Sequence, residues 1–167
     1  MQQQGCLALE DGRIFSGVGF GAQGVQTGEL VFNTSMTGYQ EILTDPSYHR
    51  QIVTMTPAHV GNTGINPQDV ESDRVWVAGF VVRALSPVVS NWRSQRDLDS
   101  YLREQGVIGL SQVATRALVR HIRSRGVMRA AIAHGEAAAD PAAMVELARA
   151  MPDMSGWNLV DDVTCAE

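Results

Sequence analysis

The sequence predicts an α/β domain with an amino-terminal β-hairpin and a partly parallel sheet covered by helices. Apolar runs that fit strands alternate with helical patterns through the second half of the chain, whereas the first half carries short strand patterns and turns. Strands that alternate with helices favour parallel pairing within one sheet. A chain of 167 residues, 44% of them hydrophobic, buries roughly 70% of the surface that its unfolded form exposes. We therefore expect one domain with a substantial core.

The chain opens on strand patterns. Cys6–Glu10 and Arg13–Phe20 flank Asp11-Gly12, a dipeptide that supplies the positive φ angles of a two-residue hairpin turn. A glycine-rich stretch then leads to Glu29–Phe32, which we interpret as a strand, and Gln51–Thr56 has the composition of a buried strand. The first half therefore predicts a hairpin and two further strands.

A short helix is expected between these two later strands. Thr37 lies three residues before Gln40, which is the spacing of a hydroxyl cap and its reciprocal amide at a helix start. Asp45-Pro46 should end this helix, because the residue before a proline is biased away from the helical region.

The second half predicts strands and helices in alternation. The strands are expected at residues 75–85, 107–110 and 127–133. Apolar residues at helical spacing predict a helix after each of them. Ser94-x-x-Asp97 precedes the first helix as a cap and Asp140-Pro141 precedes the last, while Gly106 and Gly126 should end the first two.

Charge and composition exclude several classes of protein. With 13 basic and 18 acidic residues the formal net charge is -5, which argues against a general nucleic-acid binder, because phosphate contacts need a surplus of basic side chains. Every basic residue is an arginine. A P-loop lysine, a Schiff-base lysine and a lysine general base are therefore excluded.

The sequence also bears on compartment. No stretch approaches the roughly 18 apolar residues that a membrane span needs, and the amino terminus lacks the basic and apolar regions of a signal peptide. The two cysteines, Cys6 and Cys165, lie in no C-x-x-C context, so neither a zinc site nor a disulfide framework is indicated. We expect a cytoplasmic protein with no membrane contact.

Three patterns could indicate a catalytic or cofactor site. Gly19–Gly24 matches G-x-G-x-x-G, but a strand rather than a helix follows it, so we interpret it as a glycine-rich β connection instead of a dinucleotide site. The four histidines form no metal-ligand pair. Cys6 begins a predicted strand and Cys165 lies near the chain end, so both are interpreted as structural or incidental thiols. No catalytic residue, metal ligand or cofactor-binding residue is assigned.

Arginines recur on one predicted helix. Arg116, Arg120 and Arg123 lie at i, i+4 and i+7, opposite the apolar stripe. This layout can hold phosphates or an acidic partner, but in a chain of negative net charge a solvated helix face is the favoured interpretation.

The segment from Asn33 to Tyr48 is unusually polar. It places hydroxyls, amides and a carboxylate around the short predicted helix, which is more than a surface connection requires. Two interpretations remain open on spacing alone: a ligand-binding loop, or a loop whose side chains satisfy its own backbone groups.

These residues also carry a resemblance. FNTSMTGYQEILTDPSY, followed by RQIVT and HVGNTG, closely resembles the carbamoyl phosphate synthase small chain family. Further matches occur in the family's order at residues 9–12, 28–29, 90–93, 115–118 and 155–159. The resemblance implies a swivelling β/β/α-type domain that packs against a large synthetase chain.

The resemblance also implies an activity. Residues 1–153 would be the small chain's amino-terminal domain, and residues 154–167 the start of the connection to a glutaminase domain that this chain lacks. In the family, that domain frees ammonia from L-glutamine, and the large chain uses ATP and bicarbonate to make carbamoyl phosphate for arginine and pyrimidine biosynthesis. The complex is thus a ligase with glutamine amidotransferase activity, the isolated domain is expected to be inactive, and no cofactor is expected in this chain. The family's glutamine-binding serine carries over onto Ser47.

Two positions depart from the family pattern. Pro57-Ala58 replaces a usual Tyr-Pro, and Ala114 replaces a usual aspartate before Thr-Arg. The second departure removes an N-cap carboxylate worth roughly 1 kcal/mol.

A different class of function also stays open, namely a free-standing small-molecule binding module that uses the polar loop 33–48. The reading frame downstream of Glu167 discriminates between the two.

Overall fold

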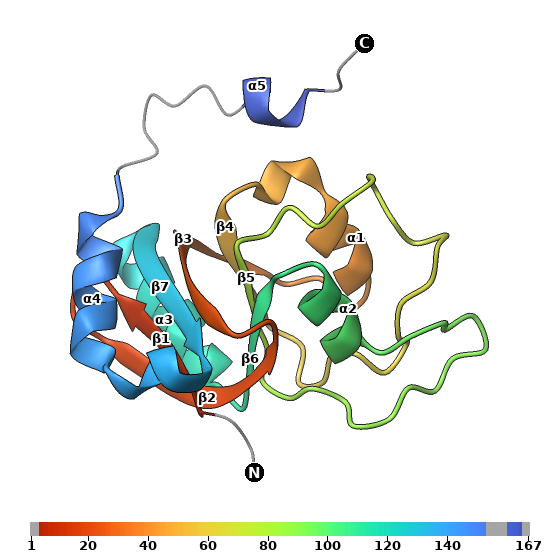
Figure 1. The fold of residues 1–167 in the computed structure, drawn as a ribbon, viewed down its shortest axis with the longest axis horizontal. Coiled ribbons are helices and arrows are strands. Elements are labelled where there is room, and N and C mark those ends of the chain that lie inside the picture. The colour runs from red at the N-terminus through yellow and green to blue at the C-terminus, as the bar shows by residue number, and fades with distance from the viewer. Residues whose placement is uncertain (1–3, 153–159, 165–167) are drawn as a thin grey trace.

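Seven strands form a closed barrel in the computed structural model, which describes residues 4–152 and 160–164 (Figure 1). The strands are β1 (Gln4–Leu9), β2 (Ile14–Gly21), β3 (Gly24–Asn33), β4 (Gln51–Met55), β5 (Gly79–Val81), β6 (Ile108–Ser111) and β7 (Met128–His134). The helices are α1 (Tyr39–Thr44), α2 (Leu98–Glu104), α3 (Thr115–Arg125), α4 (Pro141–Ala150) and α5 (Val160–Val163), with short 3-10 helices η1 (Pro46–Tyr48) and η2 (Gly135–Ala139).

The strand order around the barrel is β1-β2-β6-β5-β4-β3-β7. The pairs β3–β4, β4–β5 and β5–β6 are parallel, and the pairs on either side of them are antiparallel. The α/β class, the amino-terminal hairpin and the partly parallel sheet are therefore confirmed. Closure of the sheet was not predicted, and it leaves no strand edge free for pairing with another chain.

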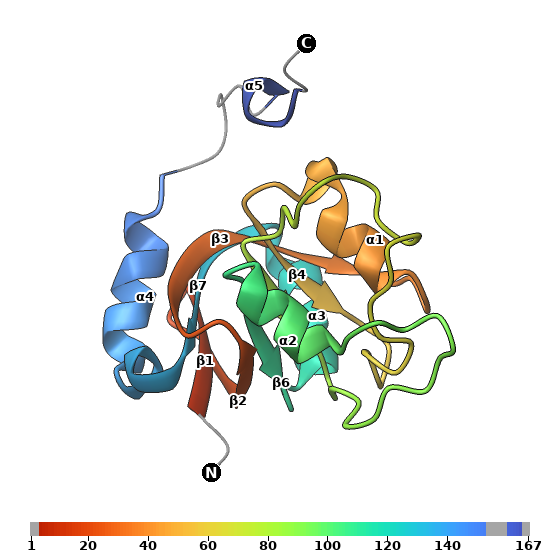
Figure 2. The same cartoon turned by 45° about the vertical axis from the view of Figure 1, so that its right-hand side comes forward.

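Alternation along the strands divides the core between the barrel and its covering helices. In β1, Leu7 and Leu9 belong to the central apolar cluster, together with Leu118 and Ile122 of α3. The alternate residues of β1 pack instead with α4, and a third cluster joins α1 and α2 to strands β4 and β5. Figure 2 shows α4 on one side of the barrel and α1 and α2 on the other.

The hairpin turn differs from the prediction. The backbone N–H of Leu9 donates to the Arg13 carbonyl at 2.8 Å, and that of Gly12 donates to the Leu9 carbonyl at 2.9 Å. Gly12 has a φ of 91°, while Asp11 is not in the left-handed region. The loop therefore has the geometry of a three-residue connection with a glycine bulge rather than a two-residue turn.

The strand expected at residues 75–85 is mostly loop. Only Gly79–Val81 forms a strand, β5. On either side, single backbone bonds from Ala78 to Gln51 and from Val82 to Leu110 replace a continuous ladder. The apolar composition of this run therefore reflects burial in the core rather than length of strand.

The helix boundaries agree with the predicted caps in the second half. The side chains of Asp97 and Asp140 accept backbone N–H groups at the starts of α2 and α4. Gly106 and Gly126 follow α2 and α3 with φ values of 70° and 92°, which is the conformation that glycine supplies after a helix.

The glycine-rich pattern at Gly19–Gly24 connects β2 to β3, so its interpretation as a β connection is confirmed. Gly19 is required by close packing, since a Cβ atom there would lie 2.0 Å from Cδ2 of His134. Gly21 and Gly24 have φ values of 71° and 130°, where other residues are strained.

Candidate functional site

Most of the polar segment 33–48 is engaged within the chain. The Asn33 side-chain amide donates to the Tyr48 hydroxyl at 2.9 Å, and the Ser35 backbone N–H donates to Asn33 Oδ1 at 2.7 Å. These bonds link the end of β3 to η1 and fold the segment back on itself.

Helix α1 holds the long loop between β4 and β5. The Tyr39 hydroxyl donates to the Gly64 carbonyl at 2.6 Å. Gln40 Nε2 donates to the Asn66 carbonyl at 2.5 Å, and Gln40 Oε1 accepts the Asn66 backbone N–H at 3.0 Å. Burial raises the pKa of the Tyr39 phenol, so it stays neutral at pH 7.

The cap expected from Thr37 and Gln40 is wrong. Gly38, with a φ of 80°, is the residue before α1, and no side chain caps the helix. Gln40 is buried and bonds the backbone of Asn66. The side-chain amide of Gln40, which the spacing predicted to cap the helix, therefore bonds a loop distant in sequence instead.

The end of α1 anchors the next part of the loop. The Thr44 hydroxyl accepts the Glu71 backbone N–H at 2.9 Å, and Ser72 Oγ donates to the Thr44 carbonyl at 2.6 Å. Trp76 Nε1 donates to the same Ser72 hydroxyl at 2.7 Å. Much of the polar segment 33–48 therefore satisfies backbone groups of its own and of loop 59–76. This agrees with the second of the two interpretations, a loop whose side chains satisfy backbone groups.

Ser47 differs from these neighbours. It is exposed in η1, and its backbone N–H donates to Asp45 Oδ1 at 2.8 Å. Backbone bonds from Tyr48 to Asp45 and from His49 to Pro46 close the turn. In the part of the chain that the structure describes, the Ser47 hydroxyl makes no hydrogen bond. A rigid turn therefore presents a hydroxyl with its bonding capacity unused.

A cluster that the sequence did not indicate follows Ser47 directly. Two side-chain atoms, Nε2 of His49 and Nη2 of Arg50, lie 3.3 Å from Asp162 Oδ2. Nη2 of Arg74 donates to the Asp162 carbonyl at 3.3 Å. Asp162 belongs to α5, at the top of both views (Figures 1 and 2). No periodicity could indicate contacts between residues more than 80 positions apart.

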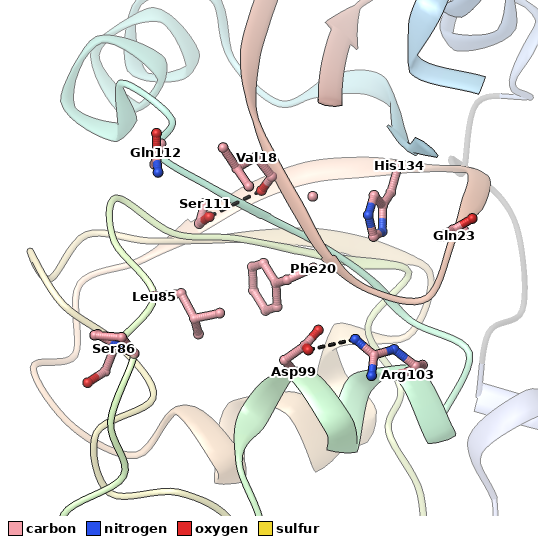
Figure 3. A pocket seen from close by; sticks show the side chains of 12 residues that line it. Val18, Phe20, Gln23, Leu85, Ser86, Asp99, Arg103, Ser111, Gln112 and His134 are labelled. Atoms are coloured by element: carbon pink, nitrogen blue, oxygen red, sulfur yellow. Dashed lines mark hydrogen bonds and ion pairs between the residues drawn. The ribbon is translucent and has the colours of Figure 1, made fainter. Parts of the chain in front are cut away.

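Several clefts lie elsewhere in the part of the domain that the structure describes. One, with a volume of about 600 Å³, is bordered by Asp99 and Arg103 of α2, which face Phe20 and His134 (Figure 3). The charges are paired, since Asp99 accepts both the Gly21 backbone N–H and Arg103 at 2.6 Å. Nδ1 of His134 lies 2.8 Å from a backbone carbonyl, and among the described residues its buried Nε2 has no partner.

A second cleft has a volume of about 760 Å³ and adjoins the polar segment. Its lining includes Met36, Tyr39, His59, Asn62 and Arg93. Ser47 borders neither cleft.

The structure also bears on the expectations for cysteine chemistry, metal binding and membrane spans. Cys6 is 2% exposed and burial raises the pKa of its thiol, so it is a poor nucleophile at pH 7. Cys165 lies outside the described residues. No group of three His, Cys, Asp or Glu side chains able to hold a metal occurs in residues 4–152 and 160–164. Over the same residues, no helix is both long and apolar enough to cross a membrane.

The three arginines of α3 point to solvent. Arg116, Arg120 and Arg123 are all exposed, and none of them forms an ion pair or side-chain hydrogen bond with the residues described. Leu118 and Ile122 on the opposite side of α3 are buried.

Comparison with known proteins places the chain in a family. The family model described as carbamoyl-phosphate synthase small chain, CPSase domain, matches residues 7–132. The chain belongs to the carbamoyl-phosphate synthase small-chain family. Proteins named carbamoyl phosphate synthase small chain from Streptomyces avermitilis and Streptomyces coelicolor are 56% and 57% identical over 161 residues. The protein of that name from Aquifex aeolicus is 52% identical over 167 residues.

The small-chain relatives are longer than this chain. The alignments with the two Streptomyces proteins cover 96% of this chain and 42% of each relative, at its amino-terminal part. Among solved structures, an aminopeptidase from Aneurinibacillus sp. strain AM-1 aligns with 80% of this chain and 30% of its own at 11% identity and a TM-score of 0.44. A likeness of this size carries no argument about fold or function.

Proposed function

We propose that this chain is the amino-terminal domain of the small chain of glutamine-hydrolysing carbamoyl phosphate synthase. Identity above 50% to proteins of that name over nearly the whole chain supports the proposal. In this proposal residues 1–153 form the domain, of the swivelling β/β/α type, and residues 154–167 begin the connection to a glutaminase domain. The complete cytoplasmic enzyme frees ammonia from L-glutamine for carbamoyl phosphate synthesis in arginine and pyrimidine biosynthesis.

The proposal divides the chemistry between partners. The glutaminase domain hydrolyses glutamine, and the large synthetase chain uses ATP and bicarbonate with the ammonia produced. The domain described here supplies packing surface and a single glutamine contact. The burial and the raised pKa of the Cys6 thiol are consistent with this supporting role.

Ser47 is the proposed glutamine contact. Its hydroxyl is exposed, unbonded among the described residues and fixed by the Asp45 turn. A serine hydroxyl offers one donor and two acceptor lone pairs, enough for the α-carboxylate or the α-ammonium of an amino acid without an added charge. This exposed hydroxyl is the observation that carries the site proposal.

Replacing Ser47 by alanine in the complete two-chain enzyme tests the contact. Loss of one hydrogen bond costs about 0.5 to 1.5 kcal/mol, or up to ~3 kcal/mol when it faces a charged group, so the glutamine KM should rise roughly 2-fold to 100-fold. The kcat should change less, because the contact is remote from the reacting amide. Ser16→Ala, at another exposed serine, is the control. An unchanged KM together with a lower melting temperature contradicts the binding role and leaves Ser47 as a turn residue.

The isolated domain should not hydrolyse glutamine. Acyl transfer needs a cysteine thiolate beside a base and an oxyanion hole, whereas the Cys6 thiol is buried and has a raised pKa. Ammonia release by the purified chain should equal the blank, with and without Cys6→Ser and Cys165→Ser. Release that either substitution abolishes would contradict the prediction.

A free-standing small-molecule binding module is the second candidate. The 760 Å³ cleft beside loop 33–48 favours it, because the cleft combines apolar and polar side chains on one face. A stop codon directly after residue 167 in the genome supports this candidate, and a reading frame that continues into a glutaminase domain supports the first.

A further inference from the structure

The turn that presents Ser47 also binds α5. His49 and Arg50 follow Ser47 by two and three residues, and both contact Asp162 Oδ2 at 3.3 Å. Arg74 adds a bond of 3.3 Å to the Asp162 carbonyl. The Asp162 carboxylate therefore contacts Arg50 and His49, while Arg74 holds the backbone carbonyl of the same residue. Three side chains from two separate parts of the chain converge on one residue of α5.

One ring nitrogen of His49 has two polar neighbours in this cluster. Its Nε2 lies 3.3 Å from Asp162 Oδ2 and also accepts from Arg50 Nε at 3.3 Å. Because one ring nitrogen either donates or accepts, it satisfies one of these partners at a time. The two arginines therefore provide the contacts to Asp162 that are independent of the histidine tautomer.

Arg50 adopts an unfavourable backbone conformation in this position. Its φ is 62°, and only Gln112 shares a positive φ among the non-glycine residues described. Residues other than glycine and asparagine rarely occupy this region, because the side chain then crowds the backbone. Its guanidinium is the group that contacts Asp162, so the strain coincides with a contact to another segment. Strain of this kind concentrates at sites with a function.

The other side of the cluster is rigid. The Arg74 guanidinium lies 3.7 Å from the centre of the Trp76 ring, and the His49 ring meets Trp76 edge-on at 5.3 Å. Trp76 is buried and is tied through Ser72 to the Thr44 carbonyl at the end of α1. The residues that hold Asp162 and the turn that carries Ser47 are therefore attached to the same end of α1.

We propose that His49, Arg50, Arg74 and Trp76 form a docking seat for the segment around Asp162, and that this seat sets the position of Ser47 relative to the polypeptide that follows. In a chain as long as the relatives, the next domain continues from this segment. A seat in the same turn as Ser47 fixes how closely that domain approaches the serine. The inference rests on the proposed glutamine role of Ser47.

The test uses the full-length small chain with its large chain. Arg50→Gly removes the guanidinium while relieving the backbone strain, so the melting temperature should stay equal or rise although the glutamine KM rises. Gln112→Gly gives the same relief at the other positive-φ position and should leave the KM unchanged. Arg74→Ala and Asp162→Asn should raise the KM in the same way.

The size of the effect follows from the exposure of the contacts. Asp162 and Arg50 side chains are 45% and 43% exposed, and ion pairs of this kind change affinities by about two- to fivefold. The kcat should change less than the KM, because the contact is remote from the reacting amide. The synthesis rate with added ammonia should not change, because that reaction needs no glutamine. Arg50→Gly combined with Asp162→Asn should raise the KM little more than either change alone.

The rate of amide hydrogen exchange at residues 160–164 reports how firmly α5 is docked, and it does not depend on glutamine. Exchange should be faster in Arg50→Gly and Arg74→Ala than in the unchanged protein or in Gln112→Gly. Equal KM and equal exchange in all variants, with a raised KM in Ser47→Ala, overturns the seat and leaves the proposed function standing. An unchanged KM in Ser47→Ala overturns the proposed glutamine contact, and faster exchange in the seat variants then still supports the docking of α5.

Discussion

Gly19 packs directly against the ring of His134, which leaves no room for a side chain at position 19. A Cβ atom at Gly19 would lie 2.0, 2.5 and 2.7 Å from three atoms of the His134 ring. The ring cannot move aside easily, because Nδ1 lies 2.8 Å from the Ala22 carbonyl and the residue is 4% exposed. This contact explains the first glycine of G-x-G-x-x-G without any phosphate.

Gly19→Ala should therefore destabilise the barrel. Overpacking at a rigid contact costs typically about 1 to 3 kcal/mol, which denaturant unfolding at pH 7 measures. His134→Ala removes the obstructing ring, so Gly19→Ala should cost much less in that background. Equal costs in the two backgrounds would mean that the ring is not the obstacle.

Gln40 shows the limit of local spacing at the residue scale. Its distance from Thr37 fits a helix cap, but its two bonds go to the backbone of Asn66. Local hydrogen bonds of capping type compete with any partner that the fold brings near. A buried backbone requires both a donor and an acceptor, and a glutamine amide supplies both to the same residue.

Among the helices, α2 begins with a side-chain cap and α3 does not. Asp97 Oδ1 accepts the Ser100 backbone N–H at 2.8 Å, and this bond lowers the pKa of Asp97. A carboxylate whose pKa falls on folding stabilises the fold above its unfolded pKa, near 3.9, and this contribution is lost as the pH falls through the lower folded pKa. Helix α3 starts after Ala114 with no side-chain cap.

Ala114→Asp should supply the missing cap. The expected gain is about 1 kcal/mol at pH 7, or a rise in melting temperature of roughly 2–4 °C for a chain of this size. The gain should disappear when the pH falls through the pKa of the new carboxyl group. Ala114→Asn, whose amide oxygen caps without a charge, should keep its gain in acid. A loss of stability at pH 7 in both variants would show that the backbone at this position, with ψ of 66°, does not accept a cap.

Charge is distributed unevenly over the whole molecule. The chain carries a net charge of -5, yet α3 exposes Arg116, Arg120 and Arg123 without partners among the described residues. Complementary charge chiefly accelerates association and adds salt dependence. This face of α3 therefore suits contact with an acidic surface of the proposed large chain.

Arg120→Glu should slow association with the large chain several-fold at low salt and change dissociation little. Stopped-flow mixing at low and high salt measures both rates. The difference should shrink at high salt, since the Debye length falls from about 30 Å at 0.01 M to about 3 Å at 1 M. Equal association rates at low salt would move the contact to another face and restore the interpretation of α3 as a solvated helix.

The sequence by itself determined the helix boundaries of the second half and the family. The side chains of Asp97 and Asp140 cap helix starts, and Gly106 and Gly126 supply the positive φ that follows a helix end. These boundaries therefore needed no tertiary information. The long polar motif identified the small-chain family because it is specific in residue order. Ser47 came from the same motif, and its glutamine role stays a prediction.

Only the tertiary structure decided the closure of the barrel and the surroundings of Ser47. Closure depends on β1 meeting β7 and β2 meeting β6, pairings of residues far apart in the chain whose apolar alternation looks the same in an open sheet. The contacts of Asp162 with Arg50 and Arg74 likewise join segments with no common periodicity. Spacing reports which face of an element is buried, whereas the partner of that face is a property of the folded chain.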